Sequence, residues 1–217
     1  MHNAMKRTEE RQIIVPAGKV SLPAFLAIPP GASGVVLFAH GSGSSRLSPR
    51  NIFVAESLRR AGLATMLMDL LTEGEDVDPA QRFAIDLLTS RLSAGVRWLR
   101  HDPATKLLPV GLFGASTGAA AALAVAARMP SVRAVVSRGG RPDLAPEACF
   151  EKISAPVLLI IGGNDEAVVG LNRLAYRQLK KTKKMMIVPG ATHLFEEPGA
   201  LTAVAAAAAA WFQKYLS

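Results

Sequence analysis

Short apolar runs rich in valine, leucine and isoleucine alternate with longer helical segments along the 217-residue chain. This alternation is typical of an α/β fold, in which helices cover both faces of a mostly parallel sheet. The runs at residues 12–15 and 20–27 flank a Pro-Ala-Gly segment and predict an opening antiparallel hairpin. Buried parallel strands are expected at residues 35–39, 64–68, 108–113, 132–137, 157–161 and 185–188.

Helical segments fall between these runs. They are expected at residues 49–61, 80–99, 116–128, 170–181 and 198–215, and each is long enough for a right-handed crossover between parallel strands. No linker or internal repeat interrupts the pattern, so we expect a single domain over residues 1–217, with residues 1–10 as a flexible tail. The longest irregular stretch, 138–154, is expected to be a loop with a short helix, which leaves no room for a cap domain.

The formal net charge of +8 raises the question of a nucleic-acid partner. The basic residues are scattered, however, and the one tight cluster consists of Lys180, Lys181, Lys183 and Lys184. No aromatic residues alternate with these lysines, as a surface that stacks on bases would require. The cluster is better explained as the solvated end of a helix, where cations favour the negative pole of the helix dipole. Nucleic-acid binding is therefore not expected.

The remaining composition argues against membrane and metal partners. Cys149 is the single cysteine, so it has no partner for an internal disulfide or a zinc site, and we expect it to be buried or partly buried. The first residues are polar, and the longest apolar run, 201–212, is too short to span a bilayer. We expect a cytoplasmic protein without metal or cofactor, either a monomer or a homodimer.

A five-residue motif marks the candidate nucleophile. Ligands of an open parallel sheet bind beyond the carboxyl ends of its strands, so the segments that follow the strands carry the chemistry. Gly114-Ala115-Ser116-Thr117-Gly118 follows one expected strand, opens an alanine-rich helix and matches the G-x-S-x-G nucleophile elbow. The two glycines leave space where a strained turn brings strand and helix together. Ser116 is therefore the candidate nucleophile.

A serine hydroxyl needs a base to take its proton and a further group to orient that base. Asp165 and His193 each follow an expected strand, in the order Ser, Asp, His that this architecture requires. Taken alone, Asp165 could be a helix cap and His193 an ordinary loop histidine. Their joint positions favour a catalytic triad, with His193 as general base and Asp165 preferred over the adjacent Glu166 as the orienting acid.

The segment His40-Gly41-Ser42-Gly43 follows the first parallel strand, where such a site takes one backbone N–H of its oxyanion hole. The expected donors are the N–H groups of Ser42, with Gly43 as second choice, and of Thr117, the residue after the nucleophile. His40 is expected to be structural and to hold the loop by hydrogen bonds.

Four arginines are also expected near this edge of the sheet: Arg46, Arg50, Arg138 and Arg141. Guanidinium groups close to a small site would favour an anionic small-molecule substrate. They could equally hold the loops through ion pairs with Asp143, Asp69 or Glu73. The sequence leaves these two interpretations open.

With these motifs in place, the chain resembles the α/β-hydrolase superfamily, and within it the dienelactone hydrolase family without a cap domain. The resemblance rests on the oxyanion segment at 40–43, the elbow at 114–118, Gly162 with Asp165, and His193. It implies hydrolysis of an ester, lactone or thioester without metal or organic cofactor. Dienelactone hydrolases carry cysteine at the elbow, whereas this chain has Ser116. The stretches 44–51 and 137–143 are also similar to hydrolase-like proteins sometimes joined to phosphoribosyltransferase domains.

The leading hypothesis is therefore an acyl hydrolase. Acyl transfer or perhydrolysis through the same acyl-enzyme is a related alternative. A non-catalytic binding or partner-regulating module on the same fold is the alternative from another class, because a fold does not by itself determine function.

Overall fold

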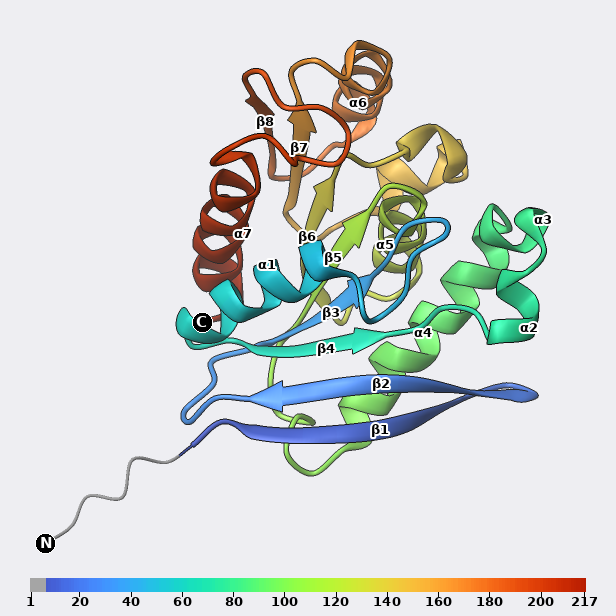
Figure 1. Cartoon of the computed structure of the whole chain (residues 1–217), viewed down its shortest axis with the longest axis vertical. Helices are drawn as coiled ribbons and strands as arrows, with labels where there is room; N and C mark the ends of the chain where they lie inside the picture. The colour runs from blue at the N-terminus through green and yellow to red at the C-terminus, as the bar shows by residue number, and fades with distance from the viewer. Residues whose placement is uncertain (1–6) are drawn as a thin grey trace, which may run out of the picture.

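The computed structural model describes residues 7–217, which form one eight-stranded sheet with helices on both faces (Figure 1). Residues 1–6 of the expected tail lie outside the described residues. The strand order is β1-β2-β4-β3-β5-β6-β7-β8. The strands are β1 Glu9–Ala17, β2 Val20–Ile28, β3 Val35–Ala39, β4 Ala64–Met68, β5 Val110–Ala115, β6 Val132–Arg138, β7 Val157–Gly162 and β8 Lys183–Val188. The expected α/β architecture is confirmed.

The sheet is mostly parallel, and β2 is the strand that runs against its neighbours. Strands β3 to β8 run parallel to one another, and β1 and β2 form the expected antiparallel hairpin, with β2 also antiparallel to β4. The hairpin is longer than predicted, because Glu9 and Glu10 pair with Ile28 and Ala27. These two glutamates were expected in the tail and belong instead to a strand.

Helices α1 Pro49–Arg60 and α7 Ala200–Leu216 pack on one face of the sheet, and α4 Ile85–His101, α5 Thr117–Arg128 and α6 Glu166–Gln178 pack on the other (Figure 1). Each face has its own apolar core. Phe38, Phe113 and Phe212 lie in the core beneath α1 and α7, and alanines of α5 lie in the other core. The alanine-rich sequence of α5 lets this helix approach the central strands closely, which fixes the position of the elbow at its start.

The helix expected at 80–99 is wrong as a single element. Residues 73–101 form three helices instead: α2 Glu73–Asp76, α3 Pro79–Arg82 and α4. Asp78 caps α3 by accepting a hydrogen bond from the N–H of Ala80 at 2.9 Å, and Pro79 occupies the first helical position. The chain then leaves helical geometry at Phe83 and begins again at Ile85. The spacing of apolar residues predicted the long helix α4 but not the separate short helix α3 before it.

The lysine cluster lies only partly where it was expected. Helix α6 ends at Gln178, so Lys180 and Lys181 follow the helix, whereas Lys183 and Lys184 begin β8. Lys183 still interacts with the end of α6, because its Nζ donates to the carbonyls of Tyr176 at 2.6 Å and Leu179 at 2.7 Å. A lysine of the neighbouring strand β8 thus supplies the cation at the carboxyl end of α6.

The loop expected at 138–154 contains two short 3-10 helices, η1 Pro142–Leu144 and η2 Glu147–Lys152. Cys149 lies in η2 and is buried, and this burial raises the pKa of its thiol to about 11. Within residues 7–217, no helix is both long enough and apolar enough to cross a membrane. The same residues contain no group of three or more His, Cys, Asp or Glu side chains placed to hold a metal ion.

Candidate active site

Ser116 stands at a sharp turn between β5 and α5. Its φ of 51° is in the left-handed region, which non-glycine residues rarely adopt. A Cβ at Gly118 would lie 2.3 Å from the carbonyl oxygen of Ala39, and one at Gly114 would lie 2.4 Å from the Cα of Ala119. Both flanking positions therefore require glycine, and the turn has the geometry of a nucleophile elbow.

The structure brings the three predicted catalytic residues together. Nε2 of His193 lies 3.3 Å from Oγ of Ser116, and Nδ1 of the same ring lies 2.6 Å from Oδ2 of Asp165. Asp165 follows β7 and His193 follows β8, so two adjacent parallel strands deliver base and acid to one edge of the sheet. Glu166, the alternative acid, is the exposed first residue of α6 and forms no hydrogen bond with the imidazole.

The loop that carries His193 is held from several sides. The N–H of Asn164 donates to the carbonyl of Ala191 at 2.9 Å, which ties the loop of the acid to the loop of the base. The N–H of Thr192 donates to the carboxylate of Glu197 at 3.0 Å, and this hydrogen bond lowers the pKa of Glu197. Phe195 is fully buried with a φ of 58°, so packing stabilises a backbone conformation that costs energy by itself. These contacts orient the imidazole toward the elbow.

The oxyanion segment lies directly against the nucleophile. A Cβ on Gly41 would lie 3.1 Å from the Cβ of Ser116, so the close approach of this loop to the serine favours glycine here, which was not predicted from the sequence. Ser42 lines the cavity beside Ser116, and Thr117 opens α5. Among the described residues, the N–H groups of Ser42 and Thr117 have no hydrogen-bond acceptor, which leaves both available to a developing oxyanion.

His40 holds this loop, as its predicted structural role requires. Its Nδ1 lies 3.0 Å from the carbonyl oxygen of Gly41, and its Nε2 accepts the N–H of Leu70 at 3.0 Å. Burial lowers the pKa of His40, which favours the neutral ring that can donate at one nitrogen and accept at the other. The ring therefore links the oxyanion loop to the segment after β4.

The four candidate arginines have different environments. Arg46 forms an ion pair with Asp69 and lies over the ring of Phe25, and Arg141 binds Asp143 through two hydrogen bonds of 2.9 and 2.7 Å. Neither lines the cavity beside Ser116. For these two, the ion-pair interpretation describes the observed contacts, with Asp69 and Asp143 as the partners.

Arg50 and Arg138 line a cavity of about 130 Å³ together with Ser116 and His193. Arg50 lies 3.0 Å from the exposed carboxylate of Glu196. Arg138 is 7% exposed and makes no ion pair within residues 7–217. Of the four arginines, these two are placed to contact a substrate.

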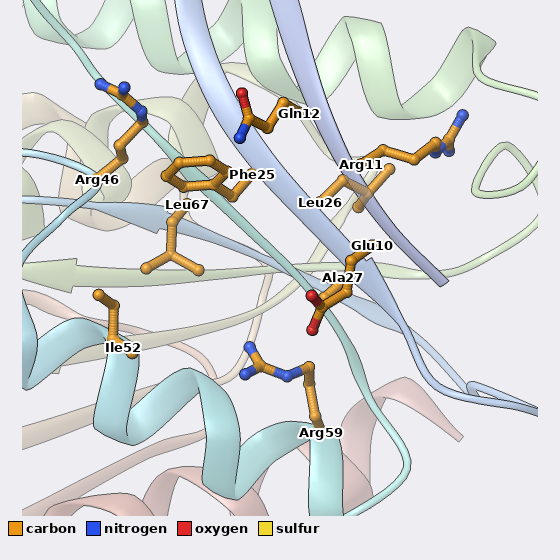
Figure 2. Close-up of a pocket in the computed structure, with 10 residues that line it drawn as sticks. All are labelled: Glu10, Arg11, Gln12, Phe25, Leu26, Ala27, Arg46, Ile52, Arg59 and Leu67. Atoms are coloured by element: carbon orange, nitrogen blue, oxygen red, sulfur yellow. The ribbon is translucent and has the colours of Figure 1, made fainter. Parts of the chain in front are cut away.

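A larger cavity of about 410 Å³ lies elsewhere, between α1 and the β1-β2-β4 part of the sheet (Figure 2). Ile52 and Arg59 reach it from α1, and Phe25 and Leu67 reach it from the sheet. None of the triad residues lines it. Its size alone does not make it the reactive site, because Ser116 and His193 line the smaller cavity instead.

Comparison with known proteins gives a consistent family. The profile of the Dienelactone hydrolase family matches residues 22–217. A crystal structure of a dienelactone hydrolase from Anabaena variabilis is 54% identical, covers 98% of this chain and 100% of its own, and superposes with a TM-score of 0.94. Est1E from Butyrivibrio proteoclasticus, at 18% identity over 94% of this chain and 98% of its own, shares the fold with a TM-score of 0.80.

Curated relatives from two strains of Mycobacterium tuberculosis are 53% identical over 212 residues. They are named provisionally as phosphoribosyl transferases. The match covers 97% of this chain but 47% of each relative, so the chain spans about half the length of these proteins.

Proposed function

This chain belongs to the dienelactone hydrolase family, and on that premise we propose that it is a serine hydrolase that cleaves small esters, lactones or thioesters through an acyl-enzyme on Ser116. The observation that carries the proposal is the continuous hydrogen-bonded series from Asp165 through His193 to Ser116, at 2.6 and 3.3 Å. A serine at a strained, accessible elbow with a base in reach is the arrangement that acyl transfer requires.

The geometry supports a role for each group. Ser116 Oγ attacks the carbonyl carbon while Nε2 of His193 takes the hydroxyl proton. Nδ1–H of His193 donates to Asp165, which orients the ring and stabilises the imidazolium that forms. The N–H groups of Thr117 and Ser42 receive the oxyanion, and the positive end of α5 favours the same charge. His193 then protonates the leaving group, and water deprotonated by the same nitrogen releases the acyl group from Ser116.

Two other reactions remain as alternatives to hydrolysis. Acyl transfer and perhydrolysis use the same acyl-enzyme, and product analysis with a competing alcohol or hydrogen peroxide separates them from hydrolysis. A non-catalytic binding module would need no such triad. The transferase name of the longer relatives does not favour phosphoribosyl transfer here, because a serine nucleophile with a histidine base is the machinery of acyl chemistry.

The test is covalent labelling of the purified protein with a fluorophosphonate, followed by identification of the modified residue. We expect the label on Ser116 and none on the Ser116→Ala variant. Ser116→Ala and His193→Ala should each lower kcat/KM for a short ester by roughly 10⁴-fold or more, and Asp165→Asn by about 10⁴-fold. Ser57→Ala is the matched control, because this hydroxyl lies on the exposed side of α1. A Ser116→Ala variant that retains most of the activity would refute the proposal.

A further inference from the structure

Arg138 is a buried cation that has no anionic partner within residues 7–217. It is the last residue of β6, and among the described residues neither its Nε nor its Nη1 has a hydrogen-bond acceptor. The guanidinium lies over the ring of Phe195, whose centroid is 5.9 Å from the guanidinium carbon. Buried charges are ordinarily paired, because an isolated charge is costly to remove from water. An unpaired cation in the wall of a reactive cavity therefore points to a ligand.

The neighbours of Arg138 add positive charge. Arg50 lines the same cavity, and its charge together with the burial of Arg138 lowers the pKa of Arg138 to about 10, with burial as the larger cause. The guanidinium thus remains charged at neutral pH. Arg50 is already paired with the exposed Glu196, so Arg138 is the cation that gains most when an anion enters this space.

The amino end of α1 faces the same cavity. Ser48 caps this 12-residue helix by accepting the N–H of Asn51 at 3.4 Å, and Ser48, Arg50 and Asn51 all line the cavity. The amino end of a helix carries partial positive charge, and it is a frequent binding site for phosphate and carboxylate. In α1 the N–H of Arg50 is the one left without an acceptor among the described residues, because Pro49 has no N–H and Ser48 binds that of Asn51. The space beside Ser116 thus lies between two helix starts, α5 with the oxyanion donors and α1 with Arg50, and Arg138 reaches it from the end of β6.

We infer that Arg138, with Arg50 and the start of α1, binds an oxyanion carried by the acyl part of the substrate, a carboxylate or a phosphate. The inference rests on the proposed function, because it places this anion beside the carbonyl that Ser116 attacks. The cavity of about 130 Å³ holds roughly four groups the size of a water molecule, so the acyl part is short. A guanidinium suits both anions, since its planar donors match pairs of oxygen atoms.

The experiment compares three short ethyl esters by acid release at constant pH. Monoethyl succinate carries a carboxylate, ethyl 3-phosphonopropanoate carries a phosphate-like group, and ethyl 4-methylpentanoate has an uncharged branched end of similar shape. We expect kcat/KM for at least one anionic ester to exceed that for the neutral ester by about tenfold or more, and the better of the two identifies the anion. Equal or lower values for both anionic esters would overturn the inference.

Variants then assign the preference to Arg138. Arg138→Gln should lower kcat/KM for the preferred anionic ester by about tenfold while leaving the neutral ester within about twofold, and Arg138→Lys should retain part of the preference. Arg128→Gln removes the same charge from the far end of α5 and should change neither ester. Equal losses for neutral and anionic esters in Arg138→Gln would show that the residue is structural.

A binding measurement covers the case in which none of these esters is turned over. At equal ionic strength, inorganic phosphate or acetate should slow fluorophosphonate labelling of Ser116 several-fold relative to chloride in the wild-type protein but not in Arg138→Gln. An unchanged labelling rate with both anions would contradict the anion site. Absence of labelling in the wild-type protein would contradict the proposed function instead, so the two failures are distinguishable.

Discussion

Replacing Arg138 with methionine should make the folded protein more stable. Burial, with a smaller contribution from Arg50, lowers the pKa of this guanidinium to about 10, so its charged form is disfavoured by about 3 kcal/mol relative to an exposed arginine. Loss of the contact with Phe195 offsets about 1 kcal/mol of that gain. A buried methionine of similar length fills the space, and the net gain in the free energy of unfolding is about 2 kcal/mol.

The sign of this effect follows from the direction of the pKa shift. A basic group whose pKa is lower in the folded state destabilises that state wherever both states are protonated, so the penalty is present in full at pH 7.5. It declines only as the pH rises above about 10. For a chain of this length, a gain of about 2 kcal/mol corresponds to an increase in Tm of roughly 4 to 8 °C.

Calorimetry and urea titration at pH 7.5 measure the change, and Arg46→Met provides the matched control. Arg46 pairs with Asp69, whose side chain is 12% exposed, so its removal leaves a largely buried carboxylate unpaired. That control should lose about 1 to 3 kcal/mol. Opposite signs for two arginine-to-methionine changes in one protein would separate a structural ion pair from an unpaired cation. If Arg138→Met melts several degrees lower, as Arg46→Met should, the reasoning about Arg138 is wrong.

Three further changes test other parts of the site. Gly118→Ala should cost several kcal/mol of stability and most activity, because its Cβ would lie 2.3 Å from the carbonyl of Ala39; circular dichroism melts and ester kinetics check this. Burial lowers the pKa of His40 below 6.5, so His40 binds a proton more readily in the unfolded chain than in the folded protein. The free energy of unfolding of the wild-type protein should therefore fall as the pH drops below about 6.5. His40→Gln should lose less stability between pH 8 and pH 5 in urea titrations, and equal losses would contradict the assignment. The Cys149 thiol, with its pKa raised to about 11, should react with a disulfide reagent at pH 8 only after unfolding, and rapid reaction of the folded protein would count against its burial.

Much of the site could be predicted because its positions follow from topology. Parallel strands in one sheet bring their carboxyl ends to one edge, so the residues that follow β5, β7 and β8 had to gather there. The glycines around Ser116 then marked the strained turn. Correct strand positions were therefore sufficient to place Ser116, Asp165 and His193 near one another.

The spacing of apolar residues was less informative where a helix cap or a contact between loops determines the structure. The expected helix at 80–99 included residues 80–82 of α3, because the spacing of apolar residues does not show that Asp78 and Pro79 begin a separate helix. The close approach of Gly41 to Ser116 also has no signal in the sequence, since a contact between two loops depends on the distance between β3 and β5.

By itself, the sequence determined the order of strands and helices, the elbow and the order of the triad, because each depends on short-range periodicity or on the general rules of parallel sheets. The tertiary structure alone decided which acid orients His193 and which arginines have partners. Arg50 meets Glu196 across 146 residues of chain, whereas Arg138 meets no carboxylate among the described residues. The physical reason is that an ion pair depends on the direction and burial of two side chains in space, and neither is encoded in their separation along the chain.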